Sequence, residues 1–113
     1  MTIYGLSQTS GAERRLFIDR VDAGVLMEVH DDEVNAGGHK IVVCAADIVA
    51  QLNEPDQGGK AIAGTSPVDG TPQALRCEVR GNEVQLWFHI GSEVSSDIAV
   101  GFDDFQDAIA AAA

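Results

Sequence analysis

The chain has 113 residues, 45% of them hydrophobic, which is enough for one domain with a real core. Eighteen acidic residues outnumber seven basic ones and give a net charge of −11 at pH 7. This charge argues against a nucleic-acid backbone or an anionic membrane as the direct partner, since binding to either requires Lys and Arg.

No apolar run approaches the roughly 20 residues of a membrane span, and no basic segment followed by an apolar one marks a signal peptide. Cys44 and Cys77 lack the spacing of a metal site, so we expect two buried, reduced thiols rather than a disulfide. The sequence therefore predicts a cytoplasmic protein without a membrane partner.

In chain order, Ile3, Tyr4 and Leu6 form a candidate edge strand within a polar lead-in. Alternating apolar residues then predict a hairpin over 16–30 that turns at 22–24. A polar loop leads to a third strand over 40–44. Helical spacing of apolar residues follows and predicts a first helix over 45–52, which Pro55 ends.

The stretch from Pro55 to Gln73 holds all three prolines and four glycines, which is typical of a linker. Beyond it, strict alternation predicts strands over 75–80 and 84–90, joined by a tight turn at Gly81-Asn82. A polar loop, a short strand over 98–101 and a second helix complete the chain. Asp103 or Asp104 is a candidate cap of that helix.

The two halves of the chain align with one another. Leu16 aligns with Leu75, Val25 with Val84 and His30 with His89. We therefore expect one α+β domain with about six antiparallel strands and two helices, built as a pseudo-twofold tandem repeat of β-β-β-α units. The units would span about 14–54 and 74–113, with the linker over 55–73.

The core is expected to contain the apolar residues that share one face of these elements. They are Phe17 or Leu16 with Ile18, Val25, Met27, Val29, Ile41, Val43, Ile48, Leu52, Leu75, Cys77, Val84, Leu86, Phe88, Ile98, Val100, Phe102, Phe105 and Ile109.

No catalytic motif stands out. The sequence has no G-x-S-x-G elbow, no H-E-x-x-H, no C-x-x-C and no phosphate loop. Cys44 and a histidine could form a nucleophile pair, but Cys44 lies in an apolar run, and the preferred interpretation is an inert thiol. We therefore predict a protein that is not an enzyme, with no catalytic residue and no cofactor.

A divalent metal at Asp31-Asp32-Glu33, flanked by His30 and His39, is a hypothesis that we do not adopt. Three consecutive acids on an extended backbone point in different directions, and the calcium-loop spacing is absent. A solvated acidic loop is the preferred interpretation. His30 and His89 could meet across a pseudo-twofold axis, but two unrelated surface histidines are the simpler interpretation.

Trp87 is predicted to lie on the face opposite the core, together with His89, while Leu26 and His30 occupy the matching face of the earlier hairpin. Such residues indicate a second packing layer or a binding surface. The arrangement of strands and a helix, used twice, resembles the Whirly and Pur-type single-strand-binding modules. That resemblance implies a base-stacking role for Trp87, which the acidic charge opposes.

The charge favours a second alternative, in which a compact acidic protein imitates a nucleic acid and inhibits a nucleic-acid-binding protein, as anti-restriction and anti-CRISPR proteins do. The candidate phosphate mimics are Asp31, Asp32, Glu33, Glu93, Asp97, Asp103, Asp104 and Asp107.

Our principal prediction is a small acidic protein that acts by binding a protein partner, for which the charge favours a basic one, or by forming a homodimer. An exposed edge strand or the helix end over 108–113 could supply the dimer contact. The predicted partner-binding residues are Trp87, His89, His30, Leu26, Asp103, Asp104 and Asp107.

Overall fold

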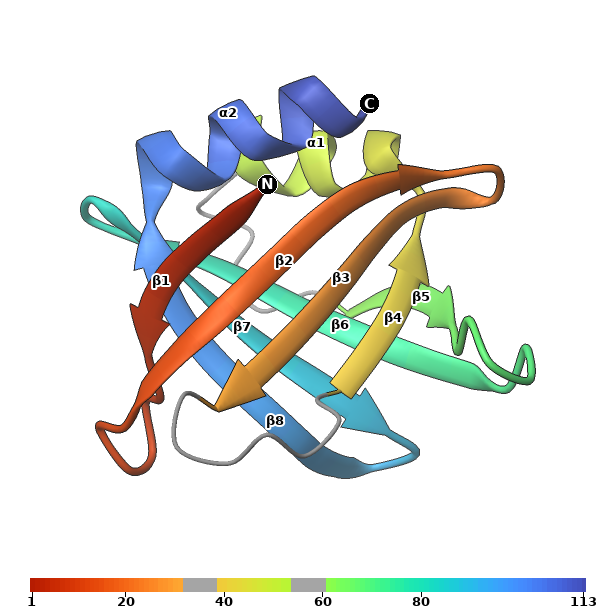
Figure 1. Cartoon of the computed structure of the whole chain (residues 1–113), viewed down its shortest axis with the longest axis horizontal. Helices are drawn as coiled ribbons and strands as arrows, with labels where there is room; N and C mark the ends of the chain where they lie inside the picture. The colour runs from red at the N-terminus through yellow and green to blue at the C-terminus, as the bar shows by residue number, and fades with distance from the viewer. Residues whose placement is uncertain (32–38, 54–60) are drawn as a thin grey trace.

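The structure, a computed structural model, describes residues 1–31, 39–53 and 61–113. Within these ranges, antiparallel strands β1 to β8 close into a barrel in their sequence order, and two helices cover one end (Figure 1). The elements are β1 (Thr2–Leu6), β2 (Glu13–Val21), β3 (Gly24–Asp31), β4 (His39–Val43), α1 (Ala45–Asn53), β5 (Ala61–Thr65), β6 (Pro72–Arg80), β7 (Glu83–Ile90), β8 (Glu93–Gly101) and α2 (Phe102–Ala112).

The expected α+β domain, with about six strands in a tandem repeat of β-β-β-α units, is therefore wrong. The architecture is a closed eight-stranded barrel in which each strand pairs with two neighbours. Two short strands account for much of the difference. β1 corresponds to the candidate edge strand that we left outside the repeat units, and β5 lies within the stretch that we expected to be a linker.

The last strand is also longer than its apolar residues indicate. β8 begins at Glu93, whereas the sequence predicted a polar loop up to residue 96. Its register with β7 shifts between Phe88 and His89, which marks a bulge near the start of β8. The predicted tight turn at Gly81-Asn82 is confirmed, and Gly81 has the positive φ of +59° that such turns favour.

The barrel interior is a packed core. An eight-stranded barrel is just wide enough for inward side chains to fill it. The prediction of the core is confirmed for nearly all its residues, although Phe17 and Phe102 are half-buried. The buried hydrophobic residues outside that prediction are Ile3, Val42, Ile62, Ala108 and Ala112.

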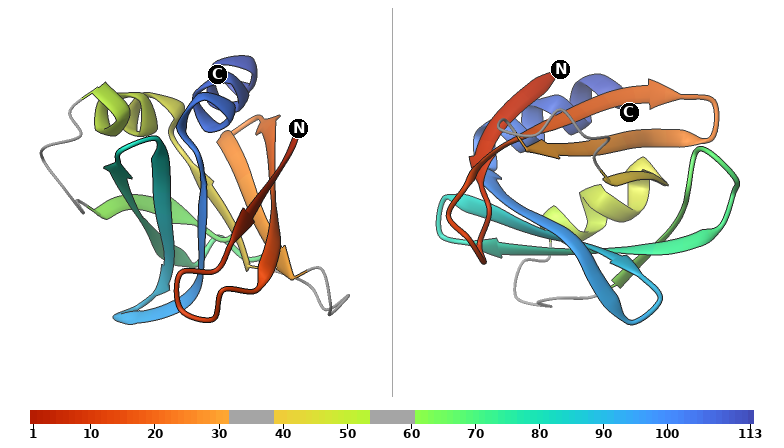
Figure 2. Two further views of the ribbon diagram at one scale, coloured as in Figure 1. Left: turned by 90° about the vertical axis from the view of Figure 1, so that its left-hand side faces the viewer. Right: turned by 60° about the horizontal axis from the view of Figure 1, so that its bottom comes forward.

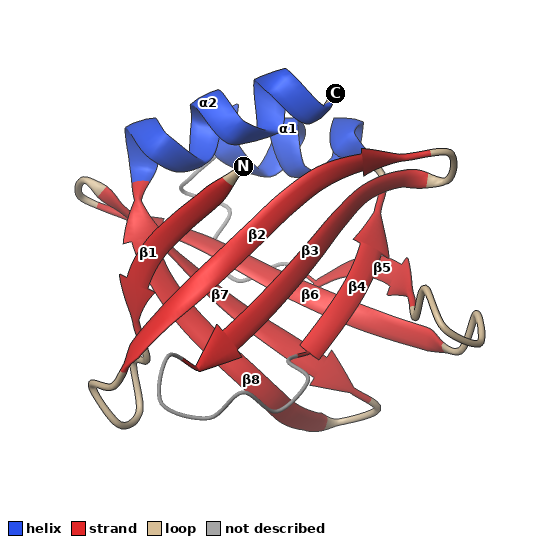
Figure 3. Cartoon of the chain, viewed as in Figure 1, coloured by secondary structure: helices blue, strands red, loops and turns tan. Residues whose placement is uncertain are grey.

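Both helices lie at the same end of the barrel, as Figures 2 and 3 show from different sides. Helix α2 buries Phe105, Ala108, Ile109 and Ala112, which recur at helical spacing. Its N-cap is Gly101 rather than Asp103 or Asp104, and the Phe102 amide donates to the Asn82 carbonyl at 2.7 Å. None of the described helices combines the length and apolar character needed to cross a membrane.

The C-terminal end of α2 is fixed by a side chain from β2. The Arg20 guanidinium donates to the carbonyls of Ala112, at 3.3 Å, and Ala113. A cation suits this end because the last carbonyls of a helix have no partner within the helix and carry partial negative charge. The long second strand is thereby tied to the helix that covers the barrel.

The barrel closes at two narrow seams. β1 and β8 are in register at Leu6 and Ala99, and β4 and β5 are in register at Val42 with Thr65 and at Val43 with Gly64. A glycine lies at each seam. A Cβ atom on Gly5 would come within 2.2 Å of the Ala99 carbonyl oxygen, and one on Gly64 within 2.7 Å of the Val42 oxygen. Any larger residue would therefore push the two strands of a seam apart.

We expect Gly5→Ala to lower the free energy of unfolding by about 1–3 kcal/mol, because the added methyl group overlaps the backbone of β8. Gly101→Ala is the control, since its Cβ would meet Asp104 Oδ2 at an ordinary 3.5 Å. We expect a change within about 0.5 kcal/mol for this control. Urea denaturation measures both values, and equal stability of the two variants would contradict the role of Gly5.

Candidate partner-binding surface

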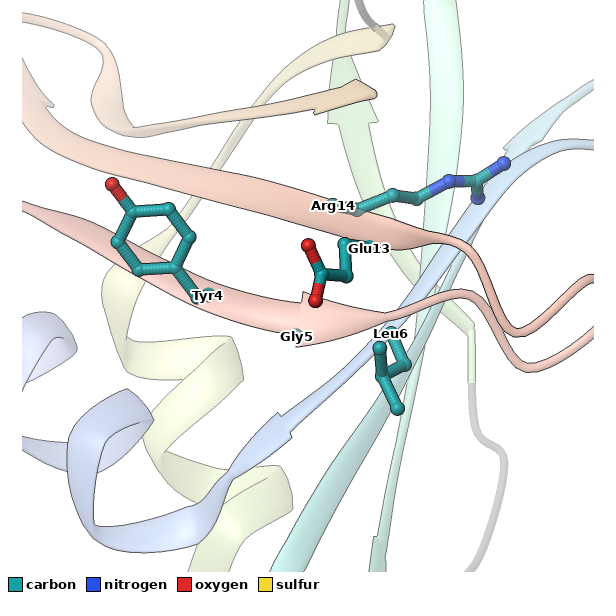
Figure 4. Close-up of a pocket in the computed structure, with 5 residues that line it drawn as sticks. All are labelled: Tyr4, Gly5, Leu6, Glu13 and Arg14. Carbon is teal, nitrogen blue, oxygen red and sulfur yellow. The ribbon is translucent and has the colours of Figure 1, made fainter. Parts of the chain in front are cut away.

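The outer side of β1 and β2 exposes large side chains on a fixed sheet. Tyr4 is 70% exposed and Leu6 is 51% exposed. Tyr4 is in register with Arg15, and Leu6 is in register with Glu13. Figure 4 shows Tyr4, Glu13 and Leu6 along this sheet, with Arg14 extending toward β8. An exposed aromatic ring beside an aliphatic and a charged side chain is the combination that anchors many protein interfaces.

Three hollows adjoin on this side of the barrel. The first is lined by Tyr4, Gly5, Leu6, Glu13 and Arg14. The second lies over β2 and β3 and is lined by Thr2, Arg15, Phe17, Glu28 and His30. The third lies between β1 and α2 and is lined by Met1, Thr2, Ile3, Tyr4, Asp104 and Asp107. We call the surface formed by the lining residues of these three hollows the β1 surface.

Buried polar contacts hold the turn after β1 against β8. Arg14 Nη1 lies 2.7 Å from Asp97 Oδ1 and donates to the Asp97 carbonyl at 2.6 Å. The Ser7 hydroxyl also donates to Asp97 Oδ1, at 2.8 Å. Asp97 is 2% exposed. The predicted role of Asp97 as an exposed phosphate mimic is therefore wrong, because Arg14 and Ser7 cover its charge.

We expect Asp97→Ala to lower the free energy of unfolding by roughly 3 kcal/mol, because it removes the buried carboxylate that Arg14 and Ser7 contact. The control is Glu78→Ala, which breaks the 2.8 Å ion pair with the largely exposed Arg80. That pair should contribute less than about 1 kcal/mol. Chemical denaturation separates the two cases, and a similar loss in both would refute the anchoring role of Asp97.

The Trp87 face lies elsewhere on the barrel. Trp87 and His89 lie on β7, whereas Leu26 and His30 lie on β3, and the barrel order places these strands on opposite sides. The structure therefore does not bring His30 and His89 together. Asp103, Asp104 and Asp107 are exposed on α2, at the end covered by the helices. The predicted partner-binding residues consequently lie on three different elements, β3, β7 and α2, and β7 is remote from β3 in the barrel order.

Trp87 is half-buried, and its ring is already in contact with a cation. The guanidinium carbon of Arg76 lies 4.3 Å from the centre of the indole ring. Arg76 and Trp87 are in register on neighbouring strands, so this cation–π contact follows from the sheet. Because Arg76 lies over one face of the ring, a base could stack on that face only by displacing the arginine.

A second polar cluster lies near the turn between β7 and β8. His39 Nε2 lies 2.8 Å from Gln73 Oε1, and His39 Nδ1 lies 2.7 Å from the Ser95 hydroxyl. The Gln73 oxygen can only accept, so Nε2 donates to it and Nδ1 accepts from Ser95. The ring also packs against Phe88 at 5.2 Å between centroids. No sequence pattern indicates that these residues lie together, because they come from β4, β6, β7 and β8.

This arrangement keeps the His39 imidazole neutral. Burial lowers the pKa of His39 below its usual value of 6.5, and the hydrogen bond that His39 donates to Gln73 opposes this only in part. A neutral imidazole held between a hydroxyl and an amide satisfies polar groups at the edge of the core. The arrangement could also supply a base to Ser95, but the prediction that the protein is not an enzyme stays a prediction.

We expect the free energy of unfolding to decrease as the pH falls through about 6.5, because the unfolded chain then binds a proton that folded His39 resists. Above the unfolded pKa this penalty is absent. His39→Gln should show a shallower decrease between about pH 7 and pH 5. Thermal or urea unfolding of both proteins across this range provides the measurement. The other histidines are common to both, and parallel curves would contradict the assignment to His39.

The hypothesis of a metal site at Asp31-Asp32-Glu33 falls on side chains outside the described part of the chain. Among the residues that the structure does describe, no group of three or more His, Cys, Asp or Glu side chains could hold a metal ion. Glu28 illustrates why. Its carboxylate lies 3.2 Å from Lys40 Nζ and 3.7 Å from His30 Nε2, so a cationic side chain already occupies the place of a metal.

The two cysteines are not linked. Cys77 is buried, and burial raises the pKa of its thiol to about 12, so it behaves as an inert part of the core. Cys44 is exposed immediately after β4, so the expectation that both thiols are buried is wrong for Cys44. It follows the last residue of the strand, where the chain turns into α1.

Comparison with protein-family models, with curated proteins and with solved structures finds no match to this chain. We therefore infer the function from the surface chemistry of the molecule.

Proposed function

We propose that this protein acts without catalysis by binding a protein partner, and that the β1 surface is where the partner binds. The observation that carries the proposal is the exposure of Tyr4, at 70%, on a strand whose neighbouring turn is anchored by a buried ion pair. A rigid aromatic side chain loses little conformational entropy when a partner covers it. Such residues contribute most of the binding energy in many interfaces.

The surrounding residues support this proposal. Phe17 is half-buried, in register with Thr2, and adds apolar area to this surface. The charged residues in register with Leu6, Tyr4 and Phe17 are Glu13, Arg15 and Glu28 respectively. A central apolar area with a charged rim is the usual anatomy of an interface. Of the partner-binding residues predicted from the sequence, His30, Asp104 and Asp107 line this surface, and Trp87 and His89 do not.

We also propose that the protein acts in the cytoplasm. Cys44 is exposed and Cys77 is buried as free thiols, which suits a reducing compartment. Homodimerisation is the other form that binding at this surface could take, and it would use the same exposed residues.

An acidic mimic of a nucleic acid is the second candidate. It is favoured by the three exposed carboxylates of Asp103, Asp104 and Asp107 near the start of α2. This function would require Asp103 as well as the two residues that line the third hollow, and it would not require Tyr4. The single-strand-binding alternative has less support, because the Arg76 side chain lies over the Trp87 ring.

The test is to replace Tyr4 with a photo-crosslinking phenylalanine derivative in the native cells. We expect a discrete adduct with one protein. The matched control carries the same derivative at Val68, which is 82% exposed in the turn between β5 and β6.

The affinity of the purified partner is then measured. Tyr4→Ala should weaken binding by about tenfold or more, as for an interface anchor, whereas Val68→Ala should change it by less than about twofold. Equal crosslinking at both positions, or full affinity of Tyr4→Ala, would refute this function for the β1 surface.

A further inference from the structure

One edge of β1 presents backbone groups without a strand beside them. Met1 and Ile18 exchange both of their backbone hydrogen bonds, each at 2.9 Å. Hydrogen-bonded pairs alternate along an antiparallel ladder, so Ile3 and Gly5 also direct their N–H and C=O groups to β2. Thr2, Tyr4 and Leu6 therefore direct theirs to the opposite side.

On that opposite side, β8 pairs with β1 at Leu6 alone. Leu6 is in register with Ala99, and two residues later the chain leaves the sheet at Gly101 and enters α2. Among the described strands, none is in register with Thr2 or Tyr4 on this side. Two residues of an otherwise closed barrel thus have the character of a short sheet edge, which is the template for strand addition.

The space beside this edge is open and acidic. A hollow of about 410 Å³ lies between β1 and α2, lined by residues 1–4 and by Asp104 and Asp107. The two aspartates are exposed and lie three positions apart, on one side of α2. A segment that paired with Thr2 and Tyr4 would lie next to both carboxylates.

We propose that this edge accepts a short, extended and basic segment of the partner protein, which adds to β1 as a further strand. The inference rests on the proposed function and specifies its partner. Thr2 and Tyr4 supply the backbone hydrogen bonds, and side chains on one face of the added segment reach Asp104 and Asp107, since successive side chains of a strand alternate. A second copy of this chain fits less well, because it would bring like charges together in a molecule of net charge −11.

The probe is a labelled peptide of alternating lysine and valine with blocked ends, and binding is followed by fluorescence anisotropy at low salt. A peptide of alternating glutamate and valine is the charge control. We expect the lysine peptide to bind and the glutamate peptide not to bind. The double variant Asp104→Asn with Asp107→Asn should weaken binding about threefold to tenfold, as expected for two exposed charge pairs. Asp22→Asn with Asp47→Asn makes the same change in net charge away from the hollow and should have little effect.

Amide hydrogen exchange tests the strand addition itself. In the free protein the amides of Ile3 and Gly5 should exchange slowly and those of Thr2 and Tyr4 quickly. The bound peptide should slow exchange at Thr2 and Tyr4. A version of the peptide methylated on its backbone nitrogens should not bind, because it cannot donate to the edge.

The outcomes separate this inference from the proposed function. Binding of the lysine peptide without protection of Thr2 and Tyr4 overturns strand addition, and equal binding of the glutamate peptide overturns the basic partner. Failure of the lysine peptide to bind also overturns the inference. If crosslinking from position 4 still succeeds in these cases, the proposed function stands, and if crosslinking fails as well, both are wrong. Concentration-dependent protection of Thr2 and Tyr4 without peptide would assign the edge to a second copy.

Discussion

Closure of the barrel is the constraint on which the rest of this structure depends. An open sheet of this length would leave two edges unpaired, and closing it removes most of that exposure. The closure relies on two seams. β1 pairs with β8 at one pair of residues, and β4 pairs with β5 at two. Gly5 and Gly64 permit the close approach, and the Arg14–Asp97 ion pair holds the first seam from the side.

The same constraint produces the candidate site. β8 ends at Gly101, two residues after Ala99 pairs with Leu6, and the chain continues as α2. The first seam is therefore incomplete, and Thr2 and Tyr4 keep a free edge. The anchoring contacts of Ser7 and Arg14 with Asp97 prevent this short strand from moving away. A surface that is both exposed and fixed binds at a smaller entropic cost than a mobile loop.

The sequence reveals the long strands and the core, because alternation over many residues leaves few alternatives. Val25, Met27, Leu75 and Val84 were assigned to the interior from periodicity alone, and all are fully buried. β5 was missed because it is short, and Ala61, Ala63 and Gly64 provide no contrast between its faces. The closed architecture was missed because it depends on contacts between the ends of the chain, which periodicity does not report.

The candidate surface was even less accessible to sequence reasoning. Trp87 drew attention as the single tryptophan, yet it lies half-buried against Arg76. Tyr4 was assigned only to a candidate edge strand, and its exposure depends on where β8 ends. The pairing of Arg14 with Asp97 joins residues from opposite ends of the chain, and the pairing of His39 with Ser95 joins different halves. The incomplete first seam also bears on folding, because the strand that completes the ring is synthesised last. Until β8 leaves the ribosome, β1 can pair only with β2, and the edges of β1 and β7 that β8 will cover remain available to neighbouring nascent chains.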